Sequence, residues 1–146
     1  MGVSSELVVA DSAEAESVTD SDEPSGSWEG FAFAGLDRIK LTTLAAILEQ
    51  GEAYESLDSR LDAISVVRNS DDGPWVDVLP PEMVLTLSRI ASMEGDSIQD
   101  LLEKWSATDE LEGWGKNDVC DLLREIGDLA ESAVLQRKTL LLWTCL

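Results

Sequence analysis

The chain has 146 residues, enough for one domain that buries most of its apolar surface. It carries 30 aspartates and glutamates, 10 lysines and arginines and no histidine, which gives a formal net charge of −20. Without histidine, neither a Ser-His-Asp or Cys-His catalytic site nor a zinc site of the usual Cys/His kind can form. A negative field of this size repels nucleic-acid phosphates and anionic lipid, so it favours a basic protein partner.

Residues 1–30 contain eight of the acidic residues and no basic one, because the first base is Arg38. Unbalanced charge and few aromatic residues predict a disordered acidic tail over 1–30, followed by a single globular domain over 31–146. Leu7, Val8 and Val9 could still form a short docking element. The apolar stretch from Leu7 to Ala10 is too short for a signal peptide and lacks a basic region before it, so we expect a cytoplasmic protein.

The first half of the domain shows two helical patterns and a hairpin. Apolar residues recur at helical spacing over 36–48, and Gly51 follows where a C-cap glycine belongs. A second helical pattern covers 54–64. Alternating residues then flank the turn sequence NSDDGP, which predicts a β-hairpin over 64–79.

Three helices and a strand are predicted in the second half. Two prolines at 80 and 81 suit the first turn of a helix over 83–91, and Asp96 is the expected N-cap of a helix through 105. Asn117 is the expected N-cap of the last and longest helix, which runs to about Lys138. Residues 139–145 are mostly apolar and predict a final strand. The expected fold is therefore mainly α within the α+β class: a compact bundle of about five helices with a small sheet from residues 64–79 and the C-terminal strand.

The motifs of enzymes and of cofactor sites are missing from the sequence. The GWGK segment at 113–116 is not a phosphate-binding loop, because Glu110 stands where its leading glycine should be and Asn117 replaces Ser or Thr. Cys120 and Cys145 lack basic neighbours that would lower the pKa of a thiol, so we expect two packing residues. We predict a protein that is not an enzyme and binds no metal or cofactor.

Acidic residues at helical spacing give the candidate binding surface. One row lies on the last helix, opposite its apolar arc, and a second lies on the preceding helix. Between them, residues 109–114 combine charge, a tryptophan and mobile glycine. The predicted partner-binding residues are Asp96, Asp100, Glu103, Asp109, Glu110, Glu112, Trp114, Asp118, Asp121, Glu125 and Asp128. The alternative interpretation of such rows is a solvated helix face without a partner.

Five tryptophans are many for a chain of this length. Trp105 and Trp143 stand at apolar positions and are predicted core residues. Trp28, Trp75 and Trp114 adjoin glycine, proline or acidic residues, which predicts loop or edge positions. Each could anchor a partner, as tryptophan often does, or pack against its own domain.

A small, acidic, mainly helical domain without catalytic motifs is similar in profile to bacterial immunity proteins, which neutralise toxins. We therefore expect a non-enzymatic acidic module that binds a basic protein, such as an immunity protein or antitoxin, without direct nucleic-acid or membrane binding. Two alternatives remain open. One is a nucleic-acid mimic that inhibits a DNA-binding protein, and the other is a small-molecule sensor or enzyme that uses carboxylates alone.

Overall fold

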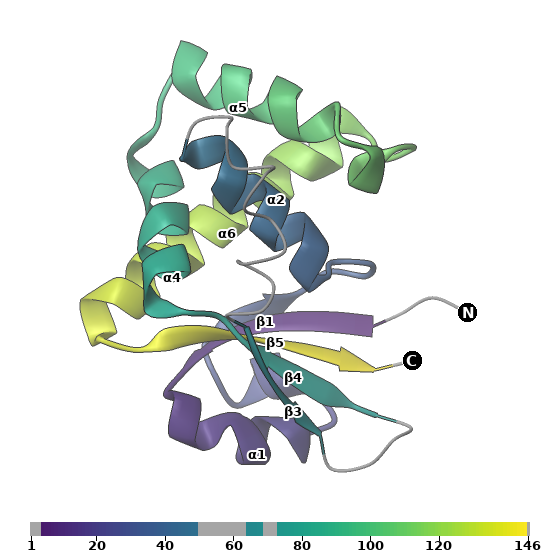
Figure 1. Ribbon diagram of the computed structural model, residues 1–146, viewed down its shortest axis with the longest axis vertical. Coiled ribbons are helices and arrows are strands. Elements are labelled where there is room, and N and C mark those ends of the chain that lie inside the picture. Colours follow the sequence, from purple (N-terminus) through teal and green to yellow (C-terminus); the bar gives the residue numbers. More distant parts are fainter. Residues whose placement is uncertain (1–3, 50–63, 69–72, 146) are drawn as a thin grey trace.

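The protein is an α+β fold built on a five-stranded antiparallel sheet, in the strand order β2-β1-β5-β4-β3 (Figure 1). The computed structural model describes residues 4–49, 64–68 and 73–145. The strands are β1 (Ser4–Ala10), β2 (Gly30–Ala32), β3 (Ser65–Arg68), β4 (Trp75–Val78) and β5 (Thr139–Cys145). The central strand β5 pairs with β1 along its whole length, from Ser4 opposite Cys145 to Ala10 opposite Thr139.

The helices are distributed unequally over the two faces of the sheet (Figure 1). They are α1 (Ala15–Thr19), α2 (Arg38–Leu48), α4 (Pro81–Ser88), α5 (Asp96–Ser106) and α6 (Lys116–Gln136). Short 3₁₀ turns occur at 12–14, 24–26, 89–92 and 109–111. The small α1 covers one face, and the four longer helices stack on the other.

Alternation along β1 and β5 explains why both faces of the sheet are covered. Leu7 and Leu142 belong to the large core beneath the longer helices, whereas Val8 and Leu141 belong to a smaller core beneath α1. Successive side chains of a strand point to opposite faces, so strands buried on both faces must be apolar throughout. The sequences LVVA in β1 and LLLW in β5 meet this requirement.

The predicted bundle with a small sheet is wrong. The hairpin over 64–79 and the C-terminal strand are confirmed, but the sheet also contains β1, which lies within the segment 1–30 predicted to be a disordered tail, and β2, which begins at the last residue of that segment. Leu7 and Val8 are fully buried, and α1 also lies within residues 1–30. A four-residue apolar run is enough to make a central strand when a complementary apolar strand is available, although the acidic residues around it dominate the composition.

The predicted helix ends are close to the observed ones. Residues 96 and 117 were expected as N-caps, but α5 begins at Asp96 with Gly95 as its cap, and α6 begins at Lys116 with Gly115 as its cap. The expected helix over 83–91 is α4 continued by a 3₁₀ turn. The helical pattern over 54–64 falls almost entirely outside the described residues, and Gly51 lies outside them.

Candidate protein-binding surface

A row of four exposed carboxylates follows one side of α6. The apolar residues of α6 recur every three or four positions and are buried against α4, α5 and the sheet. Residues on the remaining arc stay in water. Four of them form what we call the α6 acidic row: Asp118, Asp121, Glu125 and Asp128. From Asp118 to Asp128 the row rises by ten residues along the helix, or about 15 Å at the α-helical rise.

The α6 acidic row has no basic partner within the part of the chain that the structure describes. The ion pairs found there are Arg38–Asp77, Lys40–Asp37 and Lys104–Asp100. None of them includes a member of the row. The four negative charges are therefore uncompensated by close contacts, and they project a field from one side of the helix.

The predicted acidic residues of α5 are exposed as well. Asp96, Asp100 and Glu103 lie opposite the buried side of the helix, which Leu101 and Trp105 share. Asp100 Oδ2 forms an ion pair with Lys104 Nζ at 2.9 Å, and both side chains are mostly exposed. An exposed pair of this kind adds little stability, but it compensates one of the three negative charges. The α5 row is thus weaker electrostatically than the α6 acidic row.

The α6 acidic row ends at a shallow pocket on one side and at a fifth carboxylate on the other. Asp118 lines the pocket, of about 450 Å³, together with Phe33, Ala34, Gly35, Gly113, Trp114 and Gly115. At the other end, Glu29 accepts hydrogen bonds from Ser132 Oγ and Gln136 Nε2, both at 2.9 Å. Ser132 follows Asp128 by four residues and so lies on the same side of α6. Glu29 therefore extends the row, which its sequence position could not indicate.

Trp114 packs against its own domain. Its ring stacks on Phe33 at a centroid distance of 5.5 Å, and Lys40 Nζ lies 5.4 Å from the ring centroid. Asp109 and Glu112 in the preceding segment are exposed, whereas Glu110 is half-buried. The segment 109–114 thus has exposed carboxylates, but its tryptophan already contacts Phe33 and Lys40 of the same domain.

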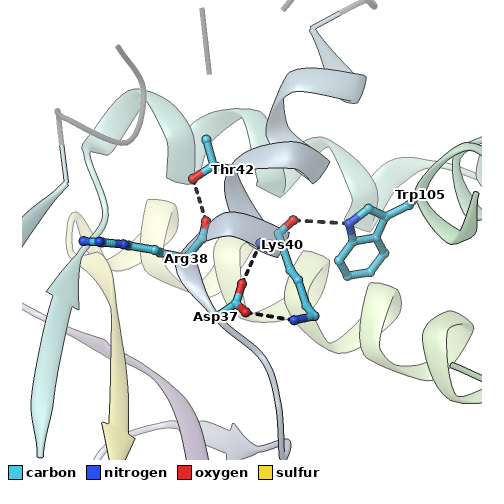
Figure 2. Close-up of polar contacts among 5 residues, drawn as sticks. All are labelled: Asp37, Arg38, Lys40, Thr42 and Trp105. Carbon is cyan, nitrogen blue, oxygen red and sulfur yellow. Dashed lines mark hydrogen bonds and ion pairs between the residues drawn. The ribbon is translucent and has the colours of Figure 1, made fainter. Parts of the chain in front are cut away.

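Trp105 and Trp143 are buried, as the sequence predicted, and Trp28, predicted at a loop or edge, is half-buried. Trp105 is fully buried and donates its indole N–H to the carbonyl of Lys40 at 3.2 Å (Figure 2). Trp143 is buried beneath α1. Trp28 is half-buried and donates to Glu14 Oε2 at 3.0 Å, a hydrogen bond that lowers the pKa of Glu14.

No protein-family model, curated protein or solved structure matches this chain. Among residues 4–49, 64–68 and 73–145, no helix is long and apolar enough to cross a bilayer. The same residues contain no group of three or more acidic or cysteine side chains placed to hold a metal ion.

Proposed function

We propose that this protein is a non-enzymatic binding module that docks a basic protein partner on the α6 acidic row. The observation that carries the proposal is the exposure of four carboxylates along about 15 Å of one rigid helix, none of which forms an ion pair among the described residues. Charges of one sign in a row attract an oppositely charged surface and orient it during the encounter.

The position of the row supports this proposal. α6 is anchored along its length by residues of the large core, including Val119, Ile126 and Ala133. The carboxylates therefore keep a fixed spacing, which limits the conformational entropy that is lost on binding. Glu29, held by Ser132 and Gln136, adds a fifth negative charge at one end.

Two variants with the same net charge distinguish binding by the α6 acidic row from a general effect of net charge. The row variant, D118N/D121N/E125Q/D128Q, removes four charges from α6. The control variant, E16Q/D22N/E23Q/E94Q, removes four exposed charges elsewhere. Each is used to capture proteins from a native lysate, with washes at about 50 mM and about 500 mM salt, because attraction between exposed charges weakens at high ionic strength.

The expected result is a basic protein that wild type and the control variant retain at low salt and release at high salt, and that the row variant does not retain. Equal retention by the row variant and wild type would refute the site. An equal loss by both variants would show that net charge, not the row, governs capture. A third variant, D96N/D100N/E103Q, measures the contribution of the α5 acids, which we expect to be the smaller one.

A further inference from the structure

A groove of about 700 Å³ is formed where the start of α4 and the end of α6 meet the segment that follows β1. These elements meet at the end of the sheet away from both chain termini (Figure 1). The walls of the groove come from Asp11–Ala13, Ser65, Val78–Glu82, Val84–Leu85, Val134 and Arg137–Thr139. These segments are far apart in the sequence, so no local pattern predicts the groove.

The groove exposes apolar side chains in a protein whose surface is otherwise dominated by carboxylates. Leu85 lines the groove and is 58% exposed, and Val134, which also lines it, is 37% exposed. Apolar side chains gathered at one place on a surface, rather than scattered singly, commonly mark an interaction site.

The charges that line the groove are balanced, unlike those of the whole chain. Asp11 and Glu82 supply two negative charges, and Arg137 and Lys138 supply two positive ones. None of the four takes part in an ion pair with another described residue. A chain with a net charge of −20 repels a copy of itself. That repulsion is smallest where the local charges sum to zero.

We propose that this groove, with Leu85 and the four charged residues, is the interface between two copies of this chain. In a two-fold dimer the same surface is used by both subunits, so the surface must complement itself. This one combines a concave apolar part, the exposed Leu85 and equal numbers of both charges. Arg137 and Lys138 of each copy face Asp11 and Glu82 of the other, and Leu85 of each copy covers the groove of the other.

The oligomeric state of the full chain tests the apolar part of the proposal. Sedimentation equilibrium over protein concentrations from about 1 μM to about 1 mM should show a species of twice the chain mass of 15.9 kDa. Leu85→Asp should raise the dissociation constant at least about tenfold, or about 1.4 kcal/mol. Ile39→Asp on α2 is the matched control, because Ile39 is also an exposed apolar residue, and it should leave the constant unchanged.

A charge exchange tests the electrostatic part without relying on Leu85. The variant R137E/K138E carries four acids in its groove, and D11K/E82K carries four bases. Each alone should stay monomeric, and a mixture of the two should form a heterodimer. A wild type that remains monomeric up to about 1 mM would overturn the proposal. So would a Leu85→Asp variant that dimerises like wild type, or a mixture in which the exchanged variants do not associate.

Discussion

Arg38 and Asp77 connect the start of α2 to an inner strand of the sheet, with Arg38 Nη1 3.8 Å from Asp77 Oδ1. The Asp77 side chain is 4% exposed, whereas that of Arg38 is 46% exposed. Asp77 Oδ1 accepts no hydrogen bond. Burial raises the pKa of Asp77, and the nearby guanidinium groups of Arg38 and Arg68 only partly oppose that effect. The pair therefore joins a largely desolvated carboxylate to a cation that water still reaches.

The first prediction concerns Asp77→Asn. The pKa of Asp77 is higher in the folded protein than its ordinary value of 3.8, so folding favours the protonated form. The folded state then loses stability as the pH rises above that value, because the buried carboxylate must ionise. Asp77→Asn removes this penalty. The variant should be more stable than wild type at pH 7, and the difference should shrink as the pH falls toward 3.8.

Urea unfolding of Asp77→Asn and wild type between pH 4 and pH 8 measures this difference. Asp128→Asn is the control, since it removes one charge from an exposed position on α6 and so has the same net charge as Asp77→Asn. Its difference from wild type should not follow the same dependence on pH. Greater stability of wild type than of Asp77→Asn at pH 7 would show that attraction to Arg38 outweighs desolvation.

The features that depend on neighbouring residues could be predicted from the sequence, and those that depend on distant residues could not. The periodicity of α6 extends over 21 residues and shows which of its acids are exposed. The strand β1 was missed because its pairing partner, β5, is more than 120 residues away, and no local pattern reveals such a pairing. The contact of Glu29 with Ser132 was missed for the same reason. The groove combines segments from both halves of the chain.

The second prediction tests the role of the N-terminal segment. Leu7 is fully buried in the large core, and it lies on a strand paired on both sides. Leu7→Ala should lower the free energy of unfolding by about 2–5 kcal/mol, the usual cost of truncating a buried leucine. Ser4→Ala, at the exposed start of the same strand, should change it by no more than about 0.5 kcal/mol. Chemical denaturation measures both, and equal stability of the two variants would mean that β1 is dispensable.

The third prediction concerns Gly127, which lies inside α6 against the turn that contains Ile90. A Cβ at Gly127 would stand 2.7 Å from Ile90 Cβ and 3.0 Å from the backbone nitrogen of Ala91. Alanine is favoured over glycine inside a helix by about 0.5–1 kcal/mol. The steric cost of overpacking, about 1–3 kcal/mol, should exceed that gain. Gly127→Ala should therefore be destabilising in thermal unfolding.

The control for Gly127→Ala is Gly26→Ala, because a Cβ at Gly26 would meet nothing within 4 Å. This substitution should be nearly neutral. A Gly127→Ala variant that is more stable than wild type would show that α6 can move away from Ile90 at little cost.

The fourth prediction separates two roles of Asp37, the N-cap of α2. Asp37 Oδ1 accepts a hydrogen bond from the backbone N–H of Lys40 at 2.9 Å, and Oδ2 lies 2.8 Å from Lys40 Nζ (Figure 2). The loss of an N-cap typically costs about 0.5–2 kcal/mol. A partly exposed ion pair contributes about 0–1 kcal/mol. Lys40→Met keeps the N-cap and removes the ion pair, together with the contact of the ammonium group with the Trp114 ring. It should therefore have the smaller effect.

A double-mutant cycle with Asp37→Ala, Lys40→Met and the combined variant measures each part by urea unfolding. If the cap dominates, Asp37→Ala in the Lys40→Met background still lowers the free energy of unfolding by most of its effect in wild type. If that background makes Asp37→Ala neutral, the ion pair carries the stabilisation instead. The cap is expected to dominate, because the Asp37 side chain is 46% exposed and water screens its attraction to the ammonium group.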